Sequence, residues 1–192
     1  MNFNTKMQTA SKFIELIQSF DTNYLSNGIA IKDSKINYRA LQICDVKIDN
    51  FGLTSKGELK IIDTDMVHPD SYLFTPKICD KHDDCHFFDC FSYCNFKTNK
   101  CNLNRINDNL QSICDKIFYN KYFKEDALIG EYDEDGGKLK LFLRKCADPG
   151  NFIGTNIKIK VDNDTSLKIN KQIENIINSI KNKNTIYDAI NI

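Results

Sequence analysis

The stretch ICDVKIDNFGL, residues 43–53, is followed by the turn Thr54–Gly57 and then by ELKIID, residues 58–63. Apolar residues stand on both sides of that turn, in FGL and in LKII. Two short strands joined by a turn are therefore expected between Asn50 and Asp63. The polar residues at the two ends of this hairpin would then lie close to each other.

The order Asp45, Asn50, Asp63 has the spacing of a protein-kinase active site. A kinase catalytic loop carries an aspartate and then an asparagine, and a metal-binding aspartate begins the D-F-G motif that follows. Here Asn50 follows Asp45 by five positions, and Asp63 follows Asn50 by thirteen. The alternative is a strand-turn-strand hairpin with solvated acids, because the D-x-K-x-x-N core is a weak motif by itself.

The residue types suit phosphoryl transfer, which needs a positioned hydroxyl and cations on the phosphates. Asp45 would accept the proton of the hydroxyl, and Lys47 would sit near the transferred phosphate. Asn50 and Asp63 would hold Mg²⁺, a hard ion that prefers oxygen ligands. Asp65, which replaces the glycine of D-F-G, either adds an oxygen ligand to the metal or is a solvated acid at a strand end.

Kinase elements that precede the catalytic loop are not found in the chain. Ile29–Lys32 mimics the V-A-I-K motif, but it lies only thirteen residues before Asp45 and no G-x-G-x-x-G precedes it. We therefore expect the 192-residue chain to be inactive on its own. The simplest explanation is a fragment, or an incomplete gene model, whose membrane anchor lies upstream.

Further motifs extend the match: IDTDMV after the second strand, a C-x5-C-x4-C-x3-C-x6-C block at 79–101, and NLQSICDKIF at 109–118. Together with the ICDVKIDNFG loop they resemble the C-terminal kinase-like region of the divergent protein kinase domain 1 family (family with sequence similarity 69). Members are cysteine-rich type II membrane proteins of the endoplasmic reticulum. The resemblance covers about residues 10–160, the C-terminal half of the family's protein.

The resemblance implies an α+β fold, mostly helical: the C-lobe of a protein-kinase-like domain over residues 1–192. It includes a short two-stranded element and a disulfide-rich insertion, the cysteine-rich segment 68–104. It also implies ATP and Mg²⁺ as cofactors, a protein or glycan acceptor, and a lumenal location reached through a membrane anchor upstream of this chain. A catalytically silent pseudokinase that binds a partner through its cysteines is the second interpretation, and an unrelated disulfide-stapled binding module is the third.

The cysteine content supports an oxidising compartment. Five of the eight cysteines lie between Cys79 and Cys101, which is typical of a disulfide framework, although eight cysteines allow 105 pairings. A zinc site built on Cys79, His82, Cys85, His86 and Cys90 is the less favoured alternative. Cys44, beside Asp45, is either a free buried thiol or a tether to the cysteine-rich segment.

Composition and periodicity add few constraints. The formal net charge is zero, so no nucleic-acid partner is implied, and no stretch is long enough to span a membrane. Apolar spacing predicts amphipathic helices at 10–25, 106–123 and 167–182. Leu139, Leu141 and Leu143 stand at alternate positions, the pattern of a short strand. Other expected features are a polar turn at Glu131–Gly137 and a glycosylation sequon at Asn163–Thr165.

Overall fold

The structure is a computed structural model that describes residues 3–26, 41–69, 73–75, 77–103, 105–119, 127–129, 138–147 and 175. The helices are α1 (Phe3–Ser26), α2 (Asn109–Ile113) and α3 (Lys138–Ala147), with a π-helical turn, η3 (Cys114–Phe118), directly after α2. Short 3-10 turns are η1 (Ile48–Asn50) and η2 (His82–Asp84). The strands are β1 (Leu41–Ile43), β2 (Phe51–Leu53), β3 (Leu59–Ile61), β4 (Val67–Pro69), β5 (His86–Phe87), β6 (Cys90–Phe91), β7 (Cys94–Asn95) and β8 (Lys100–Cys101).

The described strands form four antiparallel pairs: β1 with β4, β2 with β3, β5 with β6, and β7 with β8. The fold is therefore α+β, as expected, but it has more strand pairs than the single two-stranded element that the sequence predicted. The segment 68–104 was expected to be irregular, yet it contains both small hairpins β5–β6 and β7–β8. Each of these strands has only two residues, too few for a period of two to be visible in the sequence.

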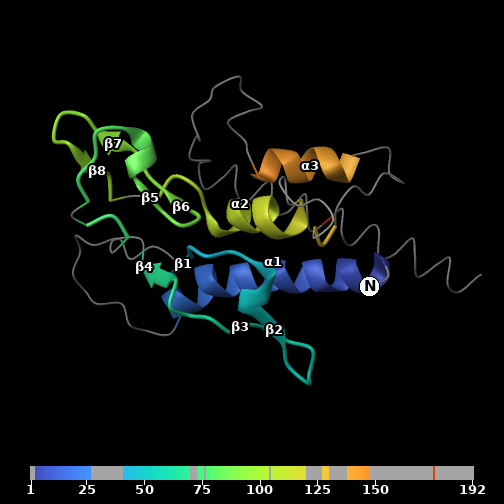
Figure 1. The fold of residues 1–192 in the computed structure, drawn as a ribbon. Coiled ribbons are helices and arrows are strands. Elements are labelled where there is room, and N and C mark those ends of the chain that lie inside the picture. The colour runs from blue at the N-terminus through green and yellow to red at the C-terminus, as the bar shows by residue number, and fades with distance from the viewer. Residues whose placement is uncertain are drawn as a thin grey trace, which may run out of the picture.

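The helix expected at residues 10–25 is confirmed within α1, which begins earlier, at Phe3. Its buried face carries Phe13 and Ile17, as predicted, and the Phe13 ring packs edge-on against Phe51 with ring centroids 4.9 Å apart. The core around them also holds Val46 from the loop after β1 and Leu59 from β3. In Figure 1, α1 runs beneath β1 and next to the β2–β3 hairpin.

The helix predicted at 106–123 begins later than expected, at Asn109. Asp108 caps it: the Asp108 carboxylate accepts from the backbone of Gln111 at 2.8 Å, and the Gln111 side chain accepts from the backbone of Asp108. This reciprocal capping box fixes the first turn. After five residues the α-helix passes into the π-helical turn η3, where Ile117 and Phe118 are buried as the periodicity indicated.

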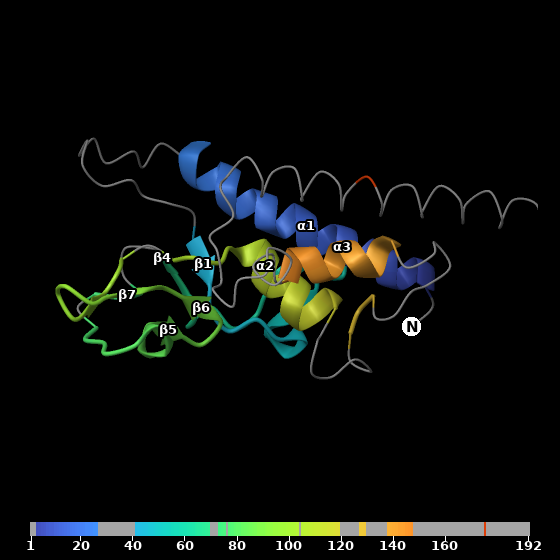
Figure 2. The same ribbon diagram turned by 90° about the horizontal axis from the view of Figure 1, so that it is seen from above.

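The strand-like alternation at Leu139–Leu143 proved misleading, because these residues belong to helix α3. Leu143 is fully buried, whereas Leu141 is 44% exposed. So short a run does not establish a period of two, because positions 139 and 143 also share one face of a helix. A disulfide between Cys146 and Cys114 attaches this helix to η3. In Figure 1, α2 lies between α1 and α3, and in Figure 2 α1 and α3 overlap when seen from above.

Four disulfides pair all eight cysteines: Cys44–Cys90, Cys79–Cys94, Cys85–Cys101 and Cys114–Cys146. The predicted disulfide framework is confirmed, and two of the bonds are internal to the cysteine-rich segment. The zinc alternative is not supported. In the described part of the chain, the sulfurs of Cys79, Cys85 and Cys94 form the single cluster of potential metal ligands, and each is already in a disulfide.

Four disulfides indicate an oxidising compartment, either secretory or extracellular. Among the described helices, none combines the length and apolar character needed to cross a bilayer. Several predicted features lie outside the described residues: Ile29–Lys32, Glu131–Gly137, Asn163–Thr165 and, apart from Asn175, the helix at 167–182.

Candidate functional site

Two strand pairs bring the Asp45 loop and the Asp63 segment side by side. Ile43 lies opposite Val67 in the β1–β4 pair, and Phe51 lies opposite Ile61 in the β2–β3 pair. Between these pairs the backbone of Cys44 donates to the Met66 carbonyl at 2.9 Å. The segments 44–50 and 62–66 are therefore joined at both ends, because the backbone of Ile62 also donates to the Asn50 carbonyl.

Asp45 and Lys47 form an ion pair at this site. The Lys47 ammonium lies 2.7 Å from Oδ2 of Asp45, and the Asp45 side chain is 21% exposed. Hydrogen bonding from Lys47 is the main reason that the pKa of Asp45 lies below its ordinary value, and the Asn50 amide lowers it further. The same pair raises the pKa of Lys47. Asp45 is thus ionised at neutral pH, and the side chains of Lys47 and Asn50 both bond to its Oδ2.

Asn50 is buried at the end of η1 and holds the Asp45 loop in shape. Its amide Nδ2 donates to the Asp45 carbonyl at 2.9 Å and to the Asp45 carboxylate at 3.0 Å. Both bonds use the amide nitrogen, so Oδ1 points away from Asp45. The carbonyl of Asn50 accepts from the backbone of Ile62 at 2.8 Å, which places Asp63 directly beside the Asn50 turn.

Asp63 and Asp65 follow β3 as exposed acids. The Oδ1 of Asp63 accepts from the Asp65 backbone at 3.2 Å. The negative charge of Asp63 also contributes to the raised pKa of Lys47, after the larger effects of Asp45 itself. An amide oxygen and two carboxylates on adjacent turns are the donor types that Mg²⁺ takes, so the residues present fit that ion.

Sequence reasoning missed Asp89, which fixes the Asp45 loop from the cysteine-rich segment. Its Oδ2 accepts from the backbone of Val46 at 2.8 Å, and its backbone donates to the Cys44 carbonyl at 2.7 Å. Its Oδ1 is 3.3 Å from the Lys116 ammonium. The neighbouring Cys90 is bonded to Cys44, so the tether alternative for Cys44 is confirmed. An acid in a tight turn gives no sequence signal for such a role.

A buried arginine, Arg105, connects strand β1 to the start of α2. Arg105 is 2% exposed, and its guanidinium donates to side-chain oxygens of Gln42 at 2.7 Å and Asn109 at 2.9 Å. Asn109 in turn accepts from the backbone of Ile43 at 2.8 Å and donates to the Leu41 carbonyl, also at 2.8 Å. The start of α2 is therefore bonded to β1, the strand that leads into Asp45. No spacing rule in the sequence pointed to Arg105.

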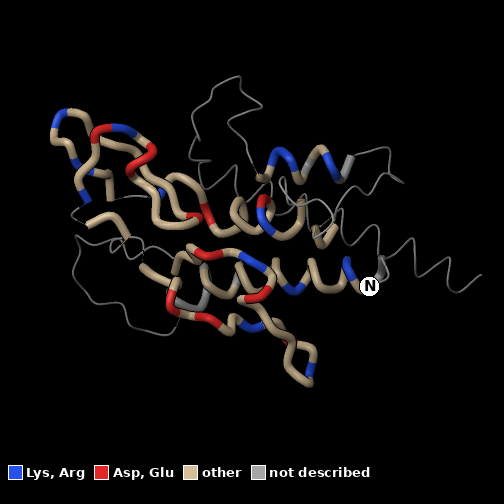
Figure 3. Tube along the Cα trace, in the orientation of Figure 1, with Lys and Arg blue, Asp and Glu red and all other residues tan. Residues whose placement is uncertain are grey.

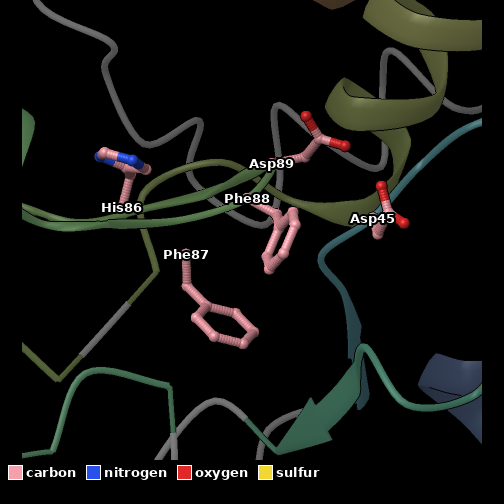
Figure 4. A pocket seen from close by; sticks show the side chains of 5 residues that line it. All are labelled: Asp45, His86, Phe87, Phe88 and Asp89. Carbon is pink, nitrogen blue, oxygen red and sulfur yellow. The ribbon is translucent and has the colours of Figure 1, made fainter.

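A pocket of about 490 Å³ opens beside Asp45. Its other lining residues are His86, Phe87, Phe88 and Asp89, all from the β5–β6 hairpin. Figure 4 shows the Phe88 ring between Phe87 and the Asp45 carboxylate. The pocket is therefore lined both by Asp45, the candidate base, and by the aromatic side chains of Phe87 and Phe88. No sequence motif pointed to these two aromatic residues.

This arrangement can hold a hydroxyl group against an ionised carboxylate, next to oxygen donors suited to a divalent cation. Comparison with known proteins identifies a kinase-like family. The family described as the protein-kinase domain of FAM69 matches residues 1–149. No solved structure matches the chain.

Proposed function

The chain belongs to the FAM69 protein-kinase domain family, and from that premise we propose that it forms the catalytic-loop half of a phosphoryl-transfer site in a kinase-like protein of the secretory pathway. In the intact protein this site would transfer the γ-phosphoryl group of ATP to a hydroxyl, with Mg²⁺. Asp45 and Lys47 are the proposed catalytic residues, and Asn50, Asp63 and Asp65 the proposed metal ligands.

The observation that carries the proposal is the orientation of the Asn50 amide. Its nitrogen donates twice to Asp45, so Oδ1 is not used by that residue, and the hydrogen bond from the Ile62 backbone to the Asn50 carbonyl holds the chain one residue before Asp63. One residue thus orders the candidate base and offers a ligand oxygen. A hairpin with merely solvated acids has no need of a 5%-exposed asparagine at this position.

Each side chain has a separate task. Asp45 is ionised and accepts a hydrogen bond from the acceptor hydroxyl, which aligns its oxygen for attack. Lys47 keeps Asp45 ionised and offers a positive charge near the transferred group. Mg²⁺, when bound, neutralises charge on the phosphates. Asn50, Asp63 and Asp65 are the residues that would hold it.

A lumenal location in the endoplasmic reticulum is part of the proposal. The four disulfides support an oxidising compartment, and the resemblance supplies the expected membrane anchor outside this chain. Both the organelle and the anchor rest on the resemblance rather than on the geometry.

A catalytically silent scaffold is the second candidate, and one observation favours it. Large apolar side chains are exposed on the cysteine-rich segment: Ile78 at 73%, Phe96 at 59% and Leu103 at 52%. Exposed apolar residues held by disulfides suit a protein partner. The two candidates differ in metal binding, because a scaffold needs no divalent cation at Asn50 and Asp63.

Mn²⁺, a paramagnetic substitute for Mg²⁺, tests the proposal on the purified chain. We expect selective broadening of the Asn50, Asp63 and Asp65 amide signals when Mn²⁺ is added with ADP, and loss of that effect in Asp63→Asn. Glu58→Gln is the matched control, since Glu58 is an exposed acid of the same hairpin that pairs with Lys60. Uniform weak broadening that Asp63→Asn leaves unchanged would support the scaffold instead.

A further inference from the structure

Phe88 has a backbone conformation that its residue type disfavours. Its φ is +49°, in the left-handed region, where a bulky side chain is an uncommon and strained occupant. Asn99 is the other such non-glycine residue in the described chain, with φ +50°, but asparagine tolerates this region. Strain of this kind persists where the surroundings impose it, and it concentrates at functional sites.

Core packing does not explain the strain, because the Phe88 side chain is 53% exposed. Its ring meets Phe87 edge-on with centroids 5.3 Å apart, and Phe87 is itself only half-buried. An asparagine or glycine at position 88 would form the same turn without strain. The phenylalanine must therefore be accounted for by what its exposed ring contacts.

The two residues that follow Phe88, Asp89 and Cys90, attach its turn to the Asp45 loop. Asp89 exchanges two hydrogen bonds with the loop, through Cys44 and Val46, and Cys90 is bonded covalently to Cys44. The backbone on either side of the pocket is therefore joined, and Figure 4 shows the Phe88 ring on the side of the pocket nearest the Asp45 carboxylate. An aromatic surface preorganised beside a candidate base is the arrangement expected of a substrate wall.

The pocket favours a compact, neutral occupant. Its volume of about 490 Å³ lies in the range of small-molecule sites, and its walls come from two short segments rather than from a long strand edge on which a peptide would extend. Both carboxylates in it already have cation partners, Lys47 for Asp45 and Lys116 for Asp89. Figure 3 shows basic and acidic residues interspersed along the loops here, whereas α3 carries mainly basic ones.

We propose that the pocket is the acceptor site of the proposed kinase-like activity, and that the acceptor is a neutral sugar unit stacked on Phe88. The C–H groups of the sugar ring would lie against the face of the Phe88 ring, and one hydroxyl of the sugar would donate a hydrogen bond to Asp45. In the transfer the hydroxyl oxygen forms the new bond to phosphorus. The bond from phosphorus to the ADP oxygen breaks with its electron pair, and the hydroxyl proton passes to Asp45.

Saturation-transfer NMR with methyl glycosides of neutral hexoses and pentoses tests the site, without nucleotide or divalent cation. We expect at least one glycoside to bind the chain, and Phe88→Asn to weaken that binding at least tenfold. The same variant should leave Tm unchanged or raise it, because it relieves the left-handed strain. Phe96→Asn is the control: Phe96 is similarly exposed on the same segment, but its ring contacts His82 and it does not line the pocket.

The inference is overturned if no glycoside binds, or if Phe88→Asn and Phe96→Asn weaken binding equally. It is also overturned if a pool of neutral serine and threonine peptides binds in a Phe88-dependent way while the glycosides do not. Because no nucleotide or metal is present, these outcomes are independent of the Mn²⁺ experiment. Failure of the acceptor site and failure of the proposed function can therefore be told apart.

Discussion

The carboxylate of Asp89 accepts a hydrogen bond at 2.8 Å from the backbone of Val46, the residue that follows Asp45. The two residues are 43 positions apart, and the contact joins the turn of a disulfide-bonded hairpin to the loop that carries the candidate base. The shape of the Asp45 loop therefore depends on the cysteine-rich segment as well as on its own two strand pairs. Changing such long-range contacts by mutation or by reduction tests this dependence.

Replacing Asp89 with alanine should loosen the Asp45 loop. A hydrogen bond to a charged group contributes about 1.5–3 kcal/mol, so we expect a loss of roughly 2 kcal/mol in the free energy of unfolding. Amide exchange at Val46 should accelerate. Asp84→Ala is the matched control, because the Asp84 carboxylate also accepts two backbone hydrogen bonds, at 2.9 and 3.0 Å, but within its own segment. Equal effects of both variants on Val46 exchange would contradict this role.

The Asp45 carboxyl should titrate below its ordinary pKa of 3.8, because Lys47 donates to it. A group with a lowered folded-state pKa stabilises the fold above the unfolded-state pKa and loses that contribution as the pH falls through the folded-state value. The contribution of Asp45 is therefore present at neutral pH and disappears in acid. In Lys47→Met, carbon-detected NMR titration should show the Asp45 pKa moving upward. An unchanged pKa would show that the ion pair is not formed in solution.

Reduction should loosen residues 79–101, whereas chelation should not. The Cys44–Cys90 bond closes the longest loop, with a sequence separation of 46, and its removal should cost up to about 4 kcal/mol by the chain-entropy estimate. Peptide mapping without reductant should recover the four pairs described above. Stoichiometric zinc together with free thiols at these cysteines would refute the framework.

Arg105→Lys should destabilise the fold although it keeps the charge. The guanidinium donates hydrogen bonds to side-chain oxygens of Gln42, Asn109 and Ser112 at the same time, at 2.7, 2.9 and 2.7 Å. The ammonium of a lysine cannot reproduce this planar set of donors. Buried acceptors left unsatisfied cost about 1–3 kcal/mol, so the urea midpoint should fall measurably. Arg144→Lys, on the exposed face of α3, should leave the midpoint unchanged.

The 192-residue chain by itself should show only background phosphoryl transfer with Mg·ATP and generic acceptors. Its sequence has no G-x-G-x-x-G loop with a following strand lysine, which position and neutralise the phosphates in kinases. The measurement is radiolabel transfer with the purified chain. Robust turnover that Asp63→Asn abolishes would show this expectation to be wrong.

The local pattern of apolar residues predicted some helices and strands correctly and others wrongly. The periodicity of residues 10–25 correctly predicted the buried face of α1, because Phe13, Ile14, Ile17 and Phe20 recur at helical spacing. The three leucines of 139–143 predicted a strand and form a helix, since so short a run fits both periods. The start of α2 was placed too early because its position depends on the cap at Asp108, a side-chain contact that apolar spacing does not report.

The sequence by itself determined the family, the α1 core and the strand-turn-strand between Asn50 and Asp63, and it favoured disulfides over a zinc site for the cysteines. Each of these depends on residue types at short, regular spacing. Only the tertiary structure decided which cysteines pair, that Asp89 fixes the Asp45 loop, that Arg105 joins β1 to α2, and that Phe88 stands beside Asp45. Those contacts join residues tens of positions apart. They form only when hairpins and helices pack, so no local pattern in the chain encodes them.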